Sequence, residues 1–311
     1  MQRPGSAPGG VAEPPLARYI PGVPAPVLAA LLCHVLISAG TFIVAKVALR
    51  DFDPMALAQL RFVLAGLGLF GVLAARGGLD FRSVQRSWRA LALLGLIGTT
   101  LNQGLFLAGL SHSTPAHGAL LYAATPIVVL CLALARGQER ASATRAVGVA
   151  LAFGGVLFLL LGRGLTFDAR WIGGDVLIFL AVIAWAVYTT RGKELIARHG
   201  VLPVTAWATL FGALCFLPVG VPALAAQDWS RVSPAGWWSL GYIALLTSVV
   251  SYLLWGWALA RVEASRVAVF TNLQPIATAL LAWALLGEPL TLHFLAATAF
   301  VLTGVWLAER G

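Results

Sequence analysis

Long apolar runs fill most of the chain, and short stretches rich in proline, glycine and charge separate them. An apolar helix of about 20 residues can cross the roughly 30 Å hydrocarbon core of a bilayer. The alternation therefore predicts an all-α integral membrane protein with ten spanning helices. The expected spans are 27–49, 55–75, 88–110, 115–135 and 145–161, followed by 174–190, 202–225, 236–260, 265–286 and 291–308.

Composition supports this fold class. Of the 311 residues, 59% are hydrophobic and 11% are charged, whereas about a quarter of the residues in a soluble domain are charged. A water-soluble fold of this length cannot bury so much apolar surface. Residues 1–26 lack apolar periodicity and are rich in proline and glycine, so they predict a flexible cytoplasmic tail.

The distribution of basic residues predicts the orientation in the membrane. The formal net charge of +9 would raise the question of nucleic acid in a soluble protein. Here fifteen of the 21 basic residues fall on the side of the two termini and four on the other side, with Lys46 and Arg61 near or within spans. The positive-inside rule then places both termini in the cytoplasm. We expect a multi-pass protein of the bacterial inner membrane, with the lipid bilayer and no nucleic acid as partner.

The chain contains an internal repeat. One constant separation aligns the segment TPAHGALLYAATPIVVLCLALARGQER with the segment ASRVAVFTNLQPIATALLAWALLGEP. Pro126 matches Pro275, which lies 149 residues later. Glu139 matches Glu288 at the same separation. A register that persists through a helix and its exit loop indicates duplication of an ancestral unit.

Five spans per unit is an odd number, so the two copies insert in opposite orientations. The segments that end in Lys46 and Lys193 also correspond at a similar separation. We therefore expect two inverted-topology five-helix repeats, residues 27–162 and 174–308, around a central cavity. Inverted repeats allow alternating access, because the same units adopt two near-equivalent arrangements. The other interpretation is that duplication only built a larger helix bundle.

Several short motifs in this order resemble one known family. They are FIVAK ending at Lys46, FDPMALAQLRF with Pro54 and Arg61, the GQE exit of the fourth span, and WAVYTTR, NLQP and LLGEP in the second half. The chain resembles the drug/metabolite transporter superfamily, specifically its EamA-type ten-helix exporters, over residues 27–308. It departs from many relatives at Ser38, where they carry a tryptophan like Trp185.

The resemblance implies a secondary transporter that exports a small amphipathic metabolite without a cofactor. Amino acids, aromatic ones included, are the first candidate substrates. The alternatives are a flippase for a lipid or lipid-linked sugar, and an exporter of nucleosides or drugs. Monomer and homodimer both stay open.

Two prolines mark candidate kinks. Pro126 and Pro275 each remove a backbone donor in mid-span, and in lipid the freed carbonyl must be satisfied by protein or water. Glu139 and Glu288 stand at the exits of the same two spans, where they could pair with arginine or lysine. We assign these four residues as candidates for helix kinking and gating.

Polar and aromatic side chains deep in the predicted spans are candidate substrate contacts. Amides in mid-span are costly unless they face partners or water, and aromatic rings offer a flat apolar face with a polar edge. The alternative is that they only tie helices together. The candidates are Asn102, Gln103, Tyr122, Thr125, Trp185, Tyr188, Tyr252, Trp255, Asn272 and Gln274.

Charged residues within the spans are few. Arg61 could attract a carboxylate or phosphate of a substrate, or it could snorkel or pair structurally. Lys46, one turn from the end of its span, snorkels more easily. All twelve acidic residues lie in tails, loops or span ends. A proton relay is therefore unsupported, and uniport and antiport both stay open.

The sequence carries no pattern of a known intramembrane enzyme. GxSxG and HExxH motifs, paired mid-span aspartates and a glycine-rich phosphate loop are all missing from it. We therefore expect no catalytic residue and no metal site.

Overall fold

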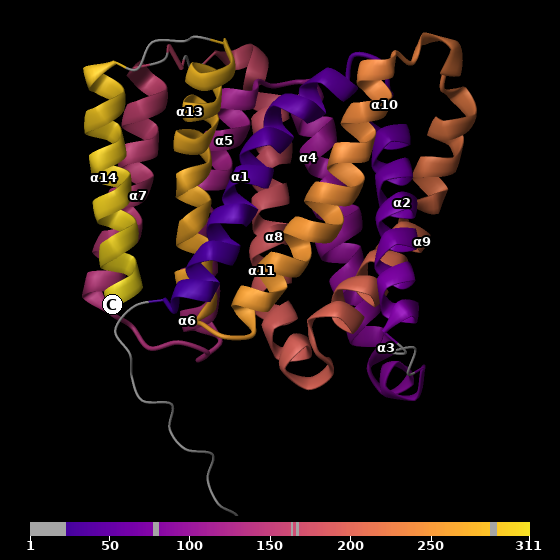
Figure 1. Ribbon diagram of the computed structural model, residues 1–311, viewed down its shortest axis with the longest axis horizontal. Coiled ribbons are helices and arrows are strands. Elements are labelled where there is room, and N and C mark those ends of the chain that lie inside the picture. Colours follow the sequence, from indigo (N-terminus) through magenta and orange to yellow (C-terminus); the bar gives the residue numbers. More distant parts are fainter. Residues whose placement is uncertain (1–22, 77–80, 163, 166–167, 287–290) are drawn as a thin grey trace, which may run out of the picture.

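The computed structural model describes residues 23–76, 81–162, 164–165, 168–286 and 291–311, and in these ranges every regular element is helical (Figure 1). Five helical runs form the first half. They are α1 (Ala25–Ala48); α2 (Pro54–Ala75); α3 (Phe81–Gly95) with the π-helical η1 (Leu96–Leu101) and α4 (Asn102–Ser111); α5 (Pro115–Ala123) with α6 (Thr125–Ala135); and α7 (Ala143–Gly162).

The second half repeats this series. After the short η2 (Ala169–Trp171), its runs are α8 (Ile172–His199); α9 (Val201–Ala226), followed by η3 (Trp229–Arg231); α10 (Pro234–Gly241) with the π-helical η4 (Tyr242–Ser251) and α11 (Tyr252–Leu259); α12 (Ala264–Ala268) with the 3₁₀ turn η5 (Val269–Leu273) and α13 (Gln274–Leu286); and α14 (Leu292–Arg310).

Nine runs in the described part of the chain are long and apolar enough to cross a bilayer. The run α12–η5–α13 makes the tenth, so the predicted fold class is confirmed. The largest boundary error is at α8, which continues to His199 instead of ending at residue 190. Charges such as Arg191 and Lys193 end the apolar pattern there, but they are good helix formers and do not end the helix.

Local sequence signals set where the helices begin. The side chain of Asp53 accepts hydrogen bonds from the backbone N–H groups of Met55 (2.8 Å) and Ala56 (3.1 Å) at the start of α2. Thr114 and Ser233 cap α5 and α10 in the same way. A proline follows each of these three caps, in the first turn where its missing N–H costs nothing.

Corresponding helices of the two halves depart from α-helical geometry at corresponding positions. The π segments η1 and η4 both interrupt the third run of their half, and a shift of 149 residues places η1 inside η4. In the fourth run, α5 and α6 are separated at Ala124, just before Pro126. The 3₁₀ turn η5 likewise ends just before Pro275. Irregular backbone at membrane depth is tolerated where protein or a cavity satisfies it.

Equivalent helices also pair across the halves. In Figure 1, α7 lies beside α14, which are the fifth runs of the two halves, and α2 likewise packs against α9. The α7–α14 contact is close because glycines face it: a Cβ on Gly148 would lie 2.7 Å from the carbonyl oxygen of Gly304. These symmetric pairs are consistent with two related halves.

Both ends of the described chain lie on one side of the helix array. The runs alternate in direction, so α1 begins and α14 ends at the same end of the molecule (Figure 1). We call this end, which carries Arg145 and Glu263, the terminal face, and the opposite end, which carries Ser113 and Asp175, the distal face. Residues 1–22 of the predicted tail lie outside the described residues.

Candidate functional site

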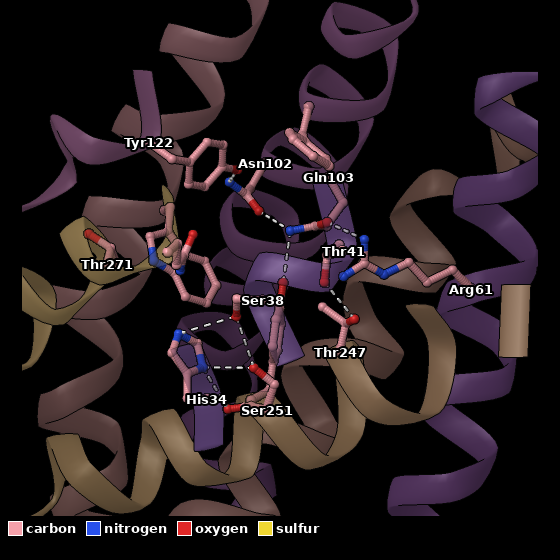
Figure 2. Close-up of a pocket in the computed structure, with 14 residues that line it drawn as sticks. His34, Ser38, Thr41, Arg61, Asn102, Gln103, Tyr122, Thr247, Ser251 and Thr271 are labelled. Carbon is pink, nitrogen blue, oxygen red and sulfur yellow. Dashed lines mark hydrogen bonds between the residues drawn. The ribbon is translucent and has the colours of Figure 1, made fainter. Parts of the chain in front are cut away.

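A cavity of about 70 Å³ is lined by residues of both halves (Figure 2). Such a volume holds a few water molecules, so a larger ligand requires the lining side chains to move. Fourteen residues line it: His34, Ser38, Thr41, Arg61, Asn102, Gln103, Phe106, Tyr122, Trp185, Thr247, Ser251, Tyr252, Thr271 and Gln274.

The internal repeat brings matched residues together at this cavity. Gln103 and Tyr252 are 149 residues apart, and each lies just after the π segment of its half. The Nε2 of Gln103 donates a hydrogen bond of 2.8 Å to the hydroxyl of Tyr252. The cavity therefore lies where equivalent positions of the two repeats meet, and two further matched pairs also line it. These are Asn102 with Ser251 and Tyr122 with Thr271.

The two adjacent amides of α4 organise the polar side of the cavity. Asn102 is fully buried, and its Nδ2 donates to the carbonyl oxygen of Ala181 (2.7 Å) and to the hydroxyl of Tyr122 (3.0 Å). Gln103 donates to Oδ1 of Asn102, and its Oε1 accepts from Nη1 of Arg61 at 2.5 Å. These bonds satisfy mid-span amides that would otherwise be costly to bury.

A row of polar side chains on α1, which sequence analysis did not assign, forms the opposite side. Nδ1 of His34 lies 2.7 Å from Oγ of Ser251, and Oγ of Ser38 lies 3.3 Å from the same oxygen. The hydroxyls of Thr41 and Thr247 are 2.9 Å apart. The three residues of α1 recur at helical spacing on one face, and this periodicity was the available signal.

Aromatic rings cover one flank of the cavity. The ring of Trp185 stacks on that of Tyr188 with centroids 5.2 Å apart, and it lies 5.2 Å from Tyr252 and 5.6 Å from Trp255. Tyr188 packs so closely on η1 that a Cβ on Gly98 would lie 2.0 Å from its ring. This position therefore requires glycine, and the flank is tightly packed.

The ten candidate substrate contacts fall into two groups. Six of them line the cavity: Asn102, Gln103, Tyr122, Trp185, Tyr252 and Gln274. The other four, Thr125, Tyr188, Trp255 and Asn272, are buried but are not among its lining residues. Within the described part of the chain, the hydroxyl of Thr125, the indole N–H of Trp255 and both amide atoms of Asn272 have no hydrogen-bond partner.

The two matched lysines make matched contacts at opposite faces. Nζ of Lys46 donates to the carbonyl oxygens of Leu110 (2.9 Å) and Ser113 (3.1 Å) at the distal face. Nζ of Lys193 donates at the terminal face to the carbonyl oxygens at the two positions 149 residues later, Leu259 (3.1 Å) and Val262. Each lysine thus satisfies carbonyls at the carboxyl end of the third run of its half.

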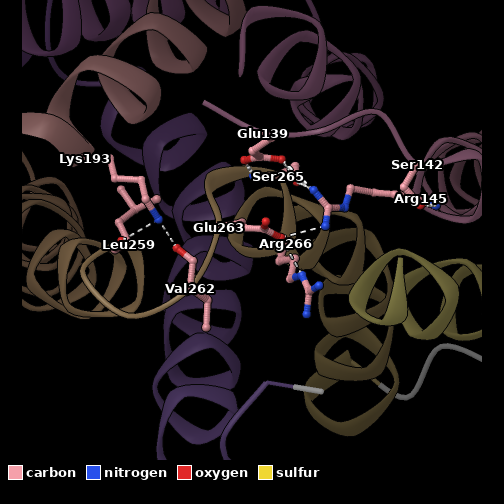
Figure 3. A network of polar contacts seen from close by, with 9 residues as sticks. All are labelled: Glu139, Ser142, Arg145, Lys193, Leu259, Val262, Glu263, Ser265 and Arg266. Atoms are coloured by element: carbon pink, nitrogen blue, oxygen red, sulfur yellow. Dashed lines mark hydrogen bonds and ion pairs between the residues drawn. The ribbon is translucent and has the colours of Figure 1, made fainter. Parts of the chain in front are cut away.

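Glu139 takes part in a buried ion-pair network at the terminal face (Figure 3). The guanidinium of Arg145 donates to Glu139 at 2.8 Å and to Glu263 at 2.6 Å. Glu139 also accepts from the backbone N–H of Ser265 at 3.0 Å. The network joins the loop after α6 to α7 and to the start of α12. Glu288, which corresponds to Glu139 in the internal repeat, lies outside the described residues.

Within the described ranges, no group of three or more histidine, cysteine, aspartate or glutamate side chains could hold a metal ion. The cavity presents amides, hydroxyls, aromatic rings and one guanidinium. Such a set can bind and orient an organic molecule through hydrogen bonds and ring contacts.

Comparison with known proteins identifies the family. An uncharacterized transporter of Archaeoglobus fulgidus is 31% identical over 83% of this chain and 88% of its own length. A probable terminal-alkyne amino-acid exporter of Streptantibioticus cattleyicolor is 27% identical over 90% of this chain and 92% of its own. A protein of known crystal structure shares the fold, with a TM-score of 0.73 and 16% identity over 91% of this chain and 96% of that one. The pattern of the EamA-like transporter family matches the chain twice, at residues 25–161 and 172–309. The protein is therefore a multi-pass membrane protein of the EamA-like transporter family.

Proposed function

We propose that this transporter exports a small amphipathic metabolite, with amino acids, aromatic ones included, as its first substrates. The observation that carries the proposal is the central cavity, which combines amides and hydroxyls with an aromatic flank and is lined by matched residues of both halves. Amphipathic molecules need both kinds of surface. The name of the Streptantibioticus relative, a probable amino-acid exporter, supports this substrate class.

Transport proceeds in this proposal by alternating access between the repeats 27–162 and 174–308. Polar contacts between the halves tie both faces around the cavity. At the terminal face, Arg145 of the first half pairs with Glu263 of the second. At the distal face, Asp175 of the second half accepts from Ser113 at 2.5 Å and lies 2.7 Å from His117 of the first. When the contacts at one face break while those at the other face remain, the cavity opens to one side of the membrane at a time.

The terminal face is cytoplasmic in this proposal, and the chain lies in the inner membrane of a bacterium. The basic residues concentrated on the side of the termini support the orientation. Labelling of single cysteines at positions 86 and 228 with a membrane-impermeant reagent tests it. We expect only position 228 to react in intact spheroplasts, and the reverse pattern would invert the orientation.

A counterflow assay in proteoliposomes tests the function. Purified protein is reconstituted in liposomes loaded with one unlabelled amino acid or nucleoside. The uptake of the same compound in labelled form is then followed for each member of the panel. Aromatic and large apolar amino acids are expected to accumulate faster than in liposomes without protein. If no compound of the panel enters faster than in the empty liposomes, the proposed function is wrong.

Two substitutions of buried amide side chains test the cavity itself. Gln103→Ala removes an amide that bonds Arg61, Asn102 and Tyr252 at the lining, so the rate of counterflow should fall roughly tenfold or more. Asn272→Ala serves as the matched control, because Asn272 is buried without a described partner and is not a lining residue. Equal losses in the two variants, with both proteins folded, would contradict the placement of the site.

A further inference from the structure

Arg61 is a buried cation without a counter-ion among the described residues. Its side chain extends from α2 to the cavity and is 1% exposed (Figure 2). Nε donates to the hydroxyl of Ser248 at 2.6 Å and Nη1 donates to Gln103 at 2.5 Å. Both partners are neutral, and no described carboxylate lies within ion-pair distance of the guanidinium. Burial of a charge at membrane depth without a partner is costly and marks functional positions.

The internal repeat shows that this charge is not part of the shared scaffold. Pro54 at the start of α2 matches Pro203 of α9 at the separation of 149 residues, and the same separation places Leu210 opposite Arg61. The lysines at the two faces, by contrast, are present in both halves. Arg61 is also the only lysine or arginine among the fourteen lining residues, and none of these is an aspartate or glutamate. The described lining therefore carries one fixed charge, and it is positive.

We propose that Arg61 binds the carboxylate of the transported molecule, so that the cavity selects substrates by a single negative charge. This inference rests on the proposed function and adds the group that is recognised. Nη2 has no bond to any described residue, and a guanidinium presents a fork of donors that suits a carboxylate. One guanidinium balances one negative charge, which favours a carboxylate over a doubly charged phosphate.

The same lining gives an ammonium group no charged partner. Apart from Arg61, the lining residues carry neutral amides and hydroxyls, the indole of Trp185 and the imidazole of His34. An ammonium group that leaves water for such a cavity gains only neutral acceptors and faces the positive charge of Arg61. The carboxylate and the apolar body should therefore carry recognition, and the amino group should contribute little.

Three probes that share a phenyl ring and a short chain separate these contributions. L-phenylalanine carries both charges, 3-phenylpropionate carries only the carboxylate, and phenethylamine carries only the ammonium. Each competes at pH 7 with labelled phenylalanine for binding to the purified protein in detergent, which avoids passive diffusion of the probes through a bilayer. We expect 3-phenylpropionate to compete at least as well as unlabelled phenylalanine, and phenethylamine to compete roughly 10- to 100-fold more weakly.

Variants of Arg61 assign the preference to this side chain. Arg61→Gln should weaken the binding of 3-phenylpropionate roughly 10- to 100-fold and leave phenethylamine unchanged or tighter. Arg61→Lys keeps the charge but loses the fork, so it should restore part of the preference. For these variants, direct binding of each labelled probe replaces the competition. Folding is checked by size-exclusion chromatography and thermal unfolding, and the wild-type series decides the question even if Arg61→Gln does not fold.

The outcomes separate this inference from the proposed function. Phenylalanine counterflow in wild-type protein, together with equal competition by the acid and the amine, would overturn the role of Arg61 and leave the transporter assignment intact. An acid preference that persists in folded Arg61→Gln would also overturn it. If none of the probes binds and no metabolite of the panel is transported, both proposals are wrong.

Discussion

The two faces of the molecule share matched lysine–carbonyl contacts but differ in their ionic contacts. Each face has a lysine that bonds two backbone carbonyls at corresponding positions, Lys46 at the distal face and Lys193 at the terminal face. The ionic contacts are unequal. At the terminal face, Arg145 bonds two carboxylates, and one of these, Glu263, also pairs with Arg266 at 2.8 Å.

The distal face joins the halves without an arginine–carboxylate pair among the described residues. Among the described residues, two carboxylates accept hydrogen bonds across the halves at this face. Asp175 accepts from a serine hydroxyl and contacts a histidine, and Asp51 accepts from the backbone N–H (3.1 Å) and the hydroxyl of Ser233.

The duplicated backbone thus keeps the lysine contacts, while the side chains that tie the halves together have diverged. At the terminal face two arginine–carboxylate pairs join the halves, Arg145 with Glu263 and Arg136 with Glu194. We infer that, among the described residues, opening the terminal face breaks more arginine–carboxylate pairs than opening the distal face.

The largest effect is expected at Arg145. Its ion pair with Glu139 is nearly closed to solvent, with side-chain exposures of 4% and 3%. Arg145→Gln leaves Glu139 and Glu263 close together without their shared cation, and breaking one side of a buried pair costs roughly 3–5 kcal/mol. We expect a large fall in the thermal unfolding temperature in detergent and in the yield of folded protein. A variant that unfolds at the wild-type temperature would show that the network does not hold the terminal face.

Substitutions of the two lysines are expected to have the next largest effects, and they test the matched lysine–carbonyl contacts. Each ammonium group donates two hydrogen bonds to backbone carbonyls, and a hydrogen bond to a charged group contributes roughly 1.5–3 kcal/mol. Lys46→Met and Lys193→Met keep the apolar stem and remove these bonds. Both variants should lower the unfolding temperature by similar amounts. A loss confined to one of them would mean that the two contacts have diverged in strength as well.

The sequence predicted the matched features of the two halves better than the ion pairs that join the halves. The separations near 149 residues identified the lysines, the prolines and the two halves, because duplication preserves spacing. It did not pair Arg145 with Glu263, which are 118 residues apart and belong to different halves. Contacts of this kind depend on how the halves pack, and periodicity within one helix does not report that.

The cavity shows the same limit. Gln103 and Tyr252 were candidates because amides and aromatic rings are unusual in mid-span, and the structure joins them directly. His34 had no carboxylate neighbour in the sequence, and its partner Ser251 lies 217 residues away. Asn272 was as polar as the lining residues, but it is buried without a described partner and is not among the lining residues. A polar residue in a span therefore indicates a free-energy cost of burial, and only the packing of the helices shows which of these residues line the cavity.

A smaller effect is expected at the distal face. The side chain of Asp175 is 26% exposed, so water compensates part of any lost contact. His117→Gln should lower the free energy of unfolding by about 1 kcal/mol, less than Arg145→Gln lowers it. Thermal unfolding of the two variants side by side measures the difference between the faces. Equal losses would remove the inferred inequality.

The smallest effect is expected at an exposed ion pair. This pair tests whether the effect of Arg145→Gln comes from burial of the ion pair or from charge alone. Arg231 and Asp228 form a pair at 2.9 Å in the loop before α10, with side-chain exposures of 82% and 52%. Water and salt screen such a pair, which typically contributes about 0–1 kcal/mol. Arg231→Gln removes the same charge as Arg145→Gln but should leave the unfolding temperature nearly unchanged at 150 mM salt. A loss as large as that of Arg145→Gln would mean that charge alone, and not enclosure between the halves, makes the terminal face the stronger one.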